Sequence, residues 1–385
     1  MLLEGKQVAI IGGGPGGLTL ARLLQQQGLA VRVYERDATR FGRQQGATLD
    51  LHDESGLRAL RAAGLLAAFQ ASFRPGAEKI RLTDAQAHVV YDERLRDTAA
   101  DFGDAHYRPE IDRGPLRDLL LDALAPDTVA WDHQVTAIAP AGSGWQLTFQ
   151  NGTTALADLL VGADGASSRV RPLVTPLRPF FTGLTVVEGN IYDGVRHAPH
   201  LTALTQGGKV FAFGGDKTII LSAKGEGSLS FYTGHHTSED WVRRSGLDFG
   251  DHQQLLAWFR QEFADWSRAW DELFASAHAY FVPRPQYCMP LDQDWPAQPN
   301  VTLLGDAAHL MPPYAGEGVN MAMLDALELS ESLTTSSFTD LQAAIAHYEQ
   351  AMRARAAAAA QQTLDSMAVM HSDQGLEFVT RLFAG

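Results

Sequence analysis

The stretch Val8-Ala9-Ile10-Ile11-Gly12-Gly13-Gly14-Pro15-Gly16-Gly17 decides the fold of this chain. An apolar run of strand length leads directly into the spacing Gly-x-Gly-x-x-Gly, which Gly12, Gly14 and Gly17 supply. In such a fingerprint the first glycine permits a tight turn, the second lets the backbone approach a pyrophosphate, and the third lets the helix pack closely on the strand. The N-terminus of that helix also directs free N–H groups toward phosphates. The stretch therefore predicts a dinucleotide-binding turn between a strand and a helix.

The residues after the fingerprint complete the unit. Residues 18–27 follow a helical pattern that ends at Gly28, and residues 31–35 read as a second strand with Glu35 at its tip. The apolar residues on one face of the helix are Leu20, Leu23 and Leu24. A carboxylate at Glu35 can accept hydrogen bonds from both hydroxyls of an adenosine ribose. A strand, a helix and a second strand with a terminal acid distinguish a dinucleotide site from a plain glycine-rich turn.

Length and composition bound the class of protein. The chain has 385 residues, of which 45% are hydrophobic and 20% charged, typical of a globular protein with two or three domains. A net charge of −14 argues against nucleic acid and anionic membranes as partners. Cys288 is the single cysteine, so an intramolecular disulfide and a Cys-x-x-Cys motif are excluded. No signal peptide and no apolar stretch of about 20 residues is visible, and we expect a cytoplasmic monomer.

The rest of the chain alternates between two characters. Residues 79–83 and 87–91 predict a small antiparallel pair, and residues 118–124 a helix after an extended entry. Short alternating runs split by Gly and Asp predict an antiparallel sheet with strands at 184–192, 201–205, 209–213, 218–222 and 228–232. Helical patterns return at 253–263 and 265–276, and an alanine-rich packing helix is expected at 340–362. The antiparallel part reads as a domain inserted between pieces of the first.

Two further strands end in glycine and aspartate. The strand at 157–163 leads into Asp164-Gly165, and the strand at 301–304 leads into Gly305-Asp306. Ligands bind at the carboxyl ends of strands in open α/β sheets, and Asp306 can bind a ribityl hydroxyl there.

The loop after the second of these strands is suited to contact with a flat ring. Residues 312–318 combine proline with glycine and so can lie against a flat heteroaromatic ring, with the amides at Asn320 facing its edge. We interpret His309 as a hydrogen-bonded structural residue and assign no catalytic acid or base.

The three motifs, in this order and spacing, resemble the group A flavoprotein aromatic hydroxylases of the para-hydroxybenzoate hydroxylase superfamily. A closer likeness, to the tetracycline-inactivating flavin monooxygenases, is carried by residues 6–18, 48–52, 109–111 and 305–320. The resemblance implies an α/β fold with a Rossmann-type FAD-binding domain, an inserted antiparallel-sheet substrate domain and a long C-terminal helix. We assign residues 1–70, 100–178 and 280–335 to the FAD-binding domain, 71–99 and 179–279 to the substrate domain, and 336–385 to the C-terminal helical segment.

The resemblance also implies site residues. The residues that would hold the ADP half of FAD are Gly12, Gly14, Pro15, Gly17, Glu35 and Arg36. Two arginines would contact FAD, namely Arg43 and Arg113. The residues shared between FAD and NADPH binding would be Asp164 and Gly165. The residues along the ribityl chain and the isoalloxazine would be Gly305, Asp306, Pro313, Gly316, Gly318, Val319 and Asn320. On the substrate sheet, the drug-degrading enzymes use Gln, Arg and His where this chain has Glu188, Lys209 and Ser230, so a tetracycline would meet a changed pocket.

The implied reaction needs few catalytic side chains. NADPH would visit transiently to reduce FAD, and O2 would add to give a C4a-hydroperoxyflavin that hydroxylates an aromatic or polyketide-like small molecule, tetracyclines included. We expect no metal site. A flavin reductase or a flavin halogenase on the same scaffold is an alternative, although the halogenase motif Trp-x-Trp-x-Ile is absent from the sequence. A flavin-bearing protein that sequesters a ligand without turnover is a third interpretation.

Overall fold

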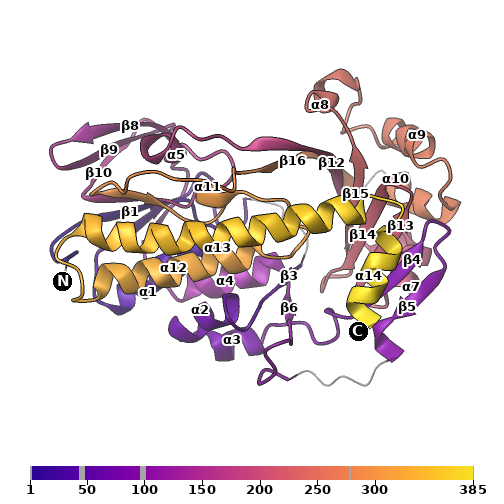
Figure 1. The fold of residues 1–385 in the computed structure, drawn as a ribbon, viewed down its shortest axis with the longest axis horizontal. Coiled ribbons are helices and arrows are strands. Elements are labelled where there is room, and N and C mark those ends of the chain that lie inside the picture. Colours follow the sequence, from indigo (N-terminus) through magenta and orange to yellow (C-terminus); the bar gives the residue numbers. More distant parts are fainter. Residues whose placement is uncertain (1, 43–47, 96–100, 277–278, 385) are drawn as a thin grey trace.

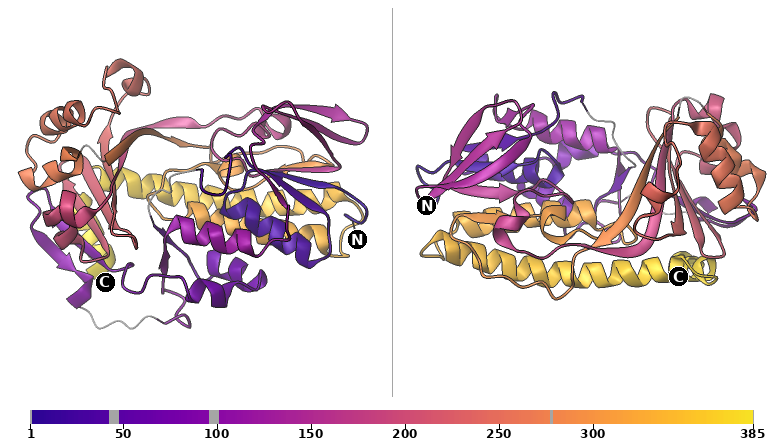
Figure 2. Two further views of the ribbon diagram at one scale, coloured as in Figure 1. Left: turned by 180° about the vertical axis from the view of Figure 1, so that it is seen from behind. Right: turned by 90° about the horizontal axis from the view of Figure 1, so that it is seen from above.

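The computed structural model describes residues 2–42, 48–95, 101–276 and 279–384. The molecule is elongated, with a parallel sheet toward one end, a seven-stranded sheet at the other, and one long helix running along both (Figure 1). Turning the molecule shows the same two parts joined by the long β12 and β16 ribbons on one side (Figure 2).

The parallel sheet forms where strands of buried apolar residues lie side by side. Its strand order is β17 (Val301–Leu303), β11 (Leu159–Gly162), β1 (Val8–Ile11), β2 (Val31–Tyr34) and β7 (Val129–Ala130). All four pairings are parallel, and Ile11 pairs with Gly162, which pairs with Leu303. The last residues of β1, β11 and β17 therefore meet at one edge of the sheet.

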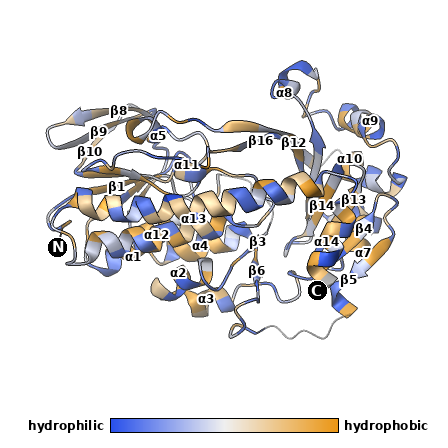
Figure 3. Ribbon diagram, viewed as in Figure 1, coloured by the Kyte–Doolittle hydropathy of each residue, from blue (hydrophilic) through white to orange (hydrophobic). Residues whose placement is uncertain are grey.

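Helices and small sheets surround this core. The helices are α1 (Pro15–Gln26), α2 (Gly56–Ala62), α3 (Leu66–Gln70), α4 (Arg113–Asp122), α5 (Arg171–Val174), α11 (Asp306–His309), α12 (Gly318–Thr334) and α13 (Leu341–Met370). The small antiparallel sheets consist of β8 (Val135–Ala141), β9 (Gly144–Phe149) and β10 (Thr154–Ala157), and of β3 (Leu49–Asp50) with β6 (Glu110–Ile111). Hydrophobic residues gather in α12, whereas the protruding α8 is hydrophilic (Figure 3).

The seven-stranded sheet has one face toward the parallel sheet and the other toward a second core. Its strand order is β16 (Ala279–Cys288), β12 (Phe180–Ile191), β15 (Leu229–His236), β14 (Lys217–Ala223), β13 (Lys209–Gly214), β4 (Ile80–Asp84) and β5 (Val89–Asp92). All neighbours are antiparallel except β13 and β4. The remaining helical elements are η1 (Glu93–Leu95), α6 (Gly194–His197), α7 (Pro199–Thr205), α8 (Trp241–Arg244), α9 (His252–Glu262), η2 (Arg268–Asp271), α10 (Glu272–Ala275) and α14 (Gly375–Ala384).

The strand expected at residues 201–205 is wrong, because this segment is the helix α7. Its sequence alternates like a strand, but Pro199 occupies the first turn, where its fixed φ and missing N–H suit a helix. Leu201 and Thr205 lie one helical turn apart and are both buried, so the burial follows the helical period.

Three expected helix boundaries also differ. The helix expected from residue 118 already begins at Arg113, because Pro115 in its first turn needs no hydrogen-bonding N–H. The helix expected at 265–276 is split into η2 and α10, with Ser267 accepting a hydrogen bond from the N–H of Ala269. The alanine-rich helix extends to Met370, because residues 341–370 contain neither Gly nor Pro.

The expected domain boundary at residues 279/280 falls at the start of a strand. That strand, β16, pairs with β12 along most of its length, from Ile191↔Ala279 to Phe180↔Cys288. The larger sheet therefore continues to Cys288. Within the described ranges, none of the helices is both long enough and apolar enough to cross a bilayer.

Candidate functional site

Three turns converge at the carboxyl edge of the parallel sheet. They follow β1, β11 and β17, and they are the three segments that the sequence singled out. The contact is close: a Cβ on Gly12 would lie 2.3 Å from the carbonyl oxygen of Ala163, and Gly12 has a φ of +110°. The first glycine is therefore required both by its backbone conformation and by the neighbouring turn.

The turn after β1 leaves room and free donors for an anionic group. Helix α1 begins after Gly14, and no side chain caps its N-terminus. A Cβ on Gly14 would meet nothing within 4 Å, so the space beside this backbone is open. Uncapped N–H groups next to open space form an anion-binding cradle. This arrangement fits the pyrophosphate of FAD.

Glu35 is buried behind the glycine turn. One carboxylate oxygen accepts the N–H of Gly13 at 2.7 Å, and the other accepts the N–H of Asp37 at 3.0 Å. The side chain therefore fixes the shape of the turn in addition to the ribose contact expected for it. Arg36, the next residue, is exposed.

Sequence reasoning missed Arg117 on α4. Its guanidinium is nearly buried and donates to the carbonyl oxygen of Gly13 at 3.3 Å and to the carboxylate of Asp37 at 3.1 Å. It also lies over the ring of Trp131, 5.3 Å from the centroid. Arg117 thus joins α4 to the glycine turn, from a position 104 residues away in the chain.

The turn after β11 is shaped by Asp164. Its carboxylate accepts hydrogen bonds from the hydroxyl of Ser168 at 2.5 Å and from the N–H of Arg169 at 2.7 Å. Burial raises the pKa of Asp164, and these hydrogen bonds oppose the shift. A Cβ on Gly165 would meet nothing within 4 Å, so open space adjoins this turn as well.

Arg171 connects this second turn to the third. Its side chain is buried and donates to the carbonyl oxygens of Asp306 and Ala307, both at 2.7 Å. This residue belongs to the motif at 158–171, but its contact 135 residues away carries no signal in the sequence.

The turn after β17 presents Asp306 to the site. Among the described residues, its carboxylate has no hydrogen-bonding partner, and the residue is exposed. Burial by surrounding protein raises its pKa, and the positive charges of His309 and Arg113 oppose that shift. Arg113, at the start of α4, has a buried Nε without a partner among the described residues.

His309 is directed toward helix α12. Its Nε2 lies 2.5 Å from a carboxylate oxygen of Asp325, a fully buried residue of α12 that also accepts the N–H of Gly305 at 2.9 Å. Arg355 of α13 donates to the same carboxylate at 2.7 Å. Burial lowers the pKa of His309, but the ion pair with Asp325 outweighs it and raises the pKa. His309 therefore belongs to a network that holds the third turn.

The loop before α12 is held by Asn320 and His52. The side chain of Asn320 is fully buried: its oxygen accepts the N–H of His52 at 2.9 Å, and its amide donates to the carbonyl oxygens of Asp50 and Gly316. Only the backbone of Asn320 remains to face a ligand. Burial lowers the pKa of His52, but the hydrogen bond to Asp50 and the carboxylate of Glu317, 3.5 Å from Nδ1, raise it overall to about 9, so the ring is protonated at neutral pH.

The other residues expected along the isoalloxazine lie on the same loop. Pro313 is exposed, Gly316 and Val319 are half-buried, and a Cβ on Gly318 would meet nothing within 4 Å. Arg43 lies outside the described residues.

Glu188, Lys209 and Ser230 lie on the same face of the seven-stranded sheet, on strands β12, β13 and β15. Val187, Val210 and Phe231, which follow or precede them, pack in the core on the opposite face. Because side chains alternate along a strand, the three polar residues point to the face toward the parallel sheet. Glu188 is buried and forms an ion pair with Arg284 of β16.

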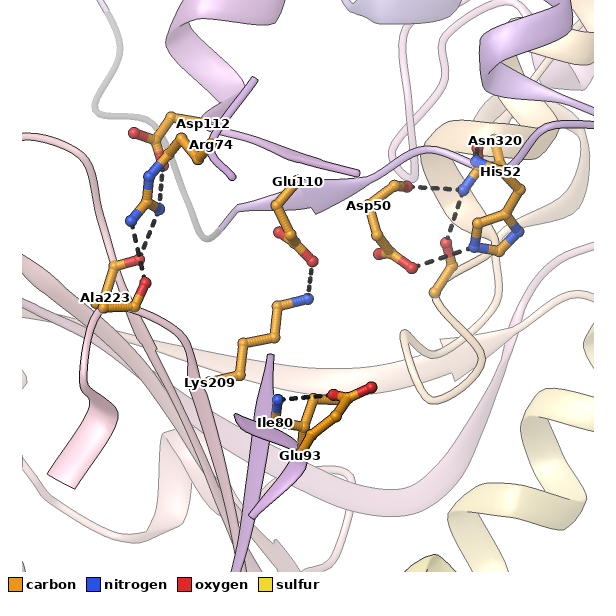
Figure 4. A network of polar contacts seen from close by, with 12 residues as sticks. Asp50, His52, Arg74, Ile80, Glu93, Glu110, Asp112, Lys209, Ala223 and Asn320 are labelled. Carbon is orange, nitrogen blue, oxygen red and sulfur yellow. Dashed lines mark hydrogen bonds and ion pairs between the residues drawn. The ribbon is translucent and has the colours of Figure 1, made fainter. Parts of the chain in front are cut away.

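Lys209 connects the seven-stranded sheet to the β3–β6 ribbon through a charged cluster (Figure 4). Its ammonium group pairs with the buried carboxylate of Glu110, and Glu110 pairs in the β3–β6 ribbon with Asp50. Burial raises the pKa of Glu110, and the charge of Lys209 opposes that shift. For Lys209, burial lowers the pKa, but Glu110 and Asp50 raise it overall. The ammonium group therefore stays protonated.

Comparison with known proteins identifies the family of this chain. The family model of the FAD binding domain matches residues 6–363. The monooxygenase asqM of Emericella nidulans is 29% identical over 445 aligned positions, covering 98% of each chain. The 3-amino-4-hydroxybenzoate 2-monooxygenase PtnB3 of Streptomyces platensis is 30% identical and covers 89% of this chain and 83% of its own.

Solved structures show the same architecture. A FAD containing monooxygenase from Photorhabdus luminescens superposes with a TM-score of 0.76 at 26% identity, covering 94% of this chain and 98% of its own. The tetracycline destructase Tet(55) has a TM-score of 0.75 over all of this chain and 96% of its own, at 18% identity, a level that shows the fold alone. The expected special closeness to tetracycline-inactivating enzymes is therefore not supported. With the matching family model, the converging turns and the shared fold, the chain belongs to the family of FAD-dependent monooxygenases of group A.

Proposed function

We propose that the protein uses NAD(P)H and O2 to hydroxylate an aromatic or polyketide-like small molecule on bound FAD. The observation that carries the proposal is the convergence of three turns, with open glycine backbone and uncapped helix N–H groups, opposite a sheet face with buried polar side chains. FAD, when bound, supplies the activation and transfer of oxygen. The protein has to bind both partners, orient them and exclude water.

The residues divide by role in this proposal. The turn at Gly12–Gly17 and the carboxylate of Glu35 hold the ADP half of FAD. Asp306 binds the ribityl chain, and Arg113 contacts the cofactor with its unpartnered Nε. The residues that line the isoalloxazine are Pro313, Gly316, Gly318, Val319 and the backbone of Asn320. The turn at Asp164 and Gly165 serves both FAD and a transient NADPH.

The substrate would lie between the loop at residues 312–318 and the seven-stranded sheet, where Lys209 and Ser230 face it. Glu188 is matched in charge by Arg284, so it acts as half of an ion pair and not as a free acid. We assign no acid–base catalyst. A tetracycline is one candidate of this chemical class, and the fold-level likeness to Tet(55) gives it no preference over other aromatic molecules.

The test starts with the purified protein reconstituted with FAD. We expect a yellow holoprotein whose NADPH or NADH oxidation rises several-fold with an aromatic substrate, together with a product that has gained one oxygen atom. A screen of aromatic compounds for faster flavin reduction, with tetracycline included, identifies the class. Failure to retain added FAD would refute the proposal. Ligand binding that never raises NAD(P)H oxidation favours a sequestering protein, and NAD(P)H oxidation without an oxygenated product favours a reductase.

A further inference from the structure

A row of polar side chains crosses the face of the seven-stranded sheet that looks toward the parallel sheet. Strand register places Lys209 opposite Ser222, Ser222 opposite Ser230, Ser230 opposite Asn190, and Asn190 opposite Tyr280. Directly paired residues present their side chains on the same face, about 5 Å apart. We call these five residues the polar row. Glu188 lies outside it, because Glu188 pairs with Tyr232 and Val282 in the next row.

The polar row begins beside the loop that would line the flavin. Lys209 at its end pairs with Glu110, and Glu110 is opposite Asp50 in the β3–β6 ribbon (Figure 4). The carboxylate of Asp50 is so near the loop that a Cβ on Gly316 would lie 3.2 Å from it. The row thus runs outward from this loop across β13, β14, β15, β12 and β16.

Two members of the row have unmet hydrogen-bonding capacity. Both the oxygen and the nitrogen of the Asn190 side-chain amide are buried without a partner among the described residues, and so is the hydroxyl of Ser230. Each residue is only 2% exposed. Leaving buried polar atoms unpaired is unfavourable, so such atoms are normally satisfied by a ligand or by water. The amide offers an acceptor and a donor side by side.

The charges around the row disfavour an anionic ligand. Three cations, Lys209, the protonated His52 and Arg108, face four carboxylates, which belong to Glu110, Asp50, Glu317 and Glu78. Even with Glu110 protonated the cluster carries no surplus positive charge. A carboxylate or phenolate beside Lys209 would therefore find its cation already neutralised.

We infer that Asn190, supported by Ser230, determines specificity by pairing with a neutral ring that carries an N–H next to a C=O, a lactam or cis-amide. The Asn190 oxygen accepts from the ring N–H, and the amide nitrogen donates to the ring carbonyl. This inference rests on the proposed function and narrows its substrate class. The sequence predicts Glu188 as the substrate-contacting residue of β12. The inference assigns that role to Asn190, which lies in one row with Ser230 and Lys209.

The test compares ligand binding by the FAD-loaded protein. The probes are the bicyclic lactam carbostyril, its N-methyl derivative, which lacks the donor, and naphthoate, which is an anion of similar size. Dissociation constants come from the change in the flavin absorption spectrum and, independently, from the ligand-induced shift in melting temperature. We expect carbostyril to bind roughly 10- to 100-fold more tightly than either analogue, because neither analogue can donate to the Asn190 oxygen. The N-methyl group also crowds that oxygen, and naphthoate brings a negative charge.

The variant Asn190→Leu keeps the branching of the side chain, with a somewhat larger volume, and removes both polar atoms. We expect it to retain FAD, to melt at the same or a higher temperature, and to bind carbostyril no better than N-methylcarbostyril. The matched control is Thr233→Val, because Thr233 is equally buried with an unpartnered hydroxyl but lies on the opposite face of β15. This control should keep the preference for carbostyril.

Three results would overturn the inference while leaving the proposed function intact. One is tighter binding of naphthoate than of carbostyril, which identifies Lys209 as an anion site. Another is an Asn190→Leu variant that keeps the preference for carbostyril. The last is a wild-type holoprotein that binds none of the three probes although other aromatic compounds raise its NAD(P)H oxidation. If Asn190→Leu does not fold, the wild-type ranking of the probes still decides.

Discussion

The hydroxyl of Tyr314 donates a hydrogen bond to Nε2 of His371 over 2.8 Å, and so ties the loop beside the third turn to the end of the longest helix. The tautomer is set by the other ring nitrogen, since Nδ1 donates to the carbonyl oxygen of Asp216 at 3.0 Å. Burial lowers the pKa of His371 to about 4, so the ring is neutral and can accept. Gly234 gives the ring its place, because a Cβ there would lie 2.5 Å from Cε1 of His371.

Replacing Tyr314 by Phe removes this bond and keeps the ring. We expect a loss of about 1 kcal/mol in the free energy of unfolding and unchanged FAD binding. We also expect a larger share of NAD(P)H oxidation to end in hydrogen peroxide, because the loop is held less firmly. The control is Tyr91→Phe. In the parent protein the hydroxyl of Tyr91 donates to the carbonyl oxygen of Phe383 at 2.9 Å. Equal peroxide yields from the two variants would contradict a positioning role for Tyr314.

The environment of His235 predicts that the free energy of unfolding falls in acid. His235 is buried among Trp241, Trp258 and Phe263, both ring nitrogens lack partners among the described residues, and burial lowers its pKa to about 4. The unfolded chain takes up a proton on this histidine near pH 6.5. The stability contributed by the neutral, buried ring is therefore complete above that pH and is lost as the pH falls toward 4. His235→Phe should therefore lose about 2 kcal/mol less stability than the parent between pH 7 and pH 5.

The measurement is urea unfolding of parent and variant at pH 7 and pH 5. The exposed His106 provides the control, and His106→Gln should leave the pH dependence unchanged. If His235→Phe loses as much stability between the two pH values as the parent does, the histidine already titrates normally in the folded protein.

Replacing Arg117 should weaken FAD binding more than replacing the neighbouring Arg40. Arg117→Ala removes a nearly buried cation from Asp37 and from the carbonyl oxygen of Gly13. We expect about 2–4 kcal/mol of lost stability and FAD binding weakened roughly tenfold or more, because the glycine turn is released. Arg40→Ala breaks only half-exposed pairs with Asp118 and Asp122 and should cost less than about 1 kcal/mol. Flavin fluorescence on titration measures both affinities, and equal affinities would show that the turn holds its shape without Arg117.

Asp306 and Asp325 separate ligand binding from folding at the third turn. Asp306→Ala removes a carboxylate with no protein partner among the described residues, so stability should stay within about 0.5 kcal/mol while FAD binds roughly 10- to 100-fold more weakly. Asp325→Ala instead leaves His309 and Arg355 without their buried counter-charge and should cost about 3 kcal/mol or more. An Asp306→Ala protein that holds FAD as tightly as the parent would remove this carboxylate from the site.

The parts of the molecule that could be predicted from sequence are those with local causes. The fingerprint at Gly12–Gly17, the strands that end at Gly162 and Leu303, and the buried role of His309 follow from residue types over short stretches. The segment at 201–205 shows the limit of such reasoning: five residues are too few to separate a strand from one turn of helix, and burial of Leu201 and Thr205 decides for the helix.

Contacts between distant segments could not be predicted. Arg117 reaches Gly13 and Arg171 reaches Asp306 only because parallel strands bring remote turns to one edge. Alternation along β12 predicts which face of the sheet a residue occupies, and Glu188 and Asn190 occupy the same face. Only the strand register shows that Asn190, and not Glu188, lies opposite Ser230. One expected residue, Arg43, falls outside the described residues.

Helix α13 fixes how far apart the two ends of the molecule are. Its first half packs in the core of the parallel sheet through Ile345, Tyr348 and Met352, and the residue after its last turn, His371, touches β14 and the loop at Tyr314. Thirty helical residues without Gly or Pro form an unbroken rod of about 45 Å. A hinge motion that separates the two ends would therefore require helix α13 to break. We expect a larger ligand to be accommodated by local rearrangement of the loop at residues 312–318, which Tyr314 anchors.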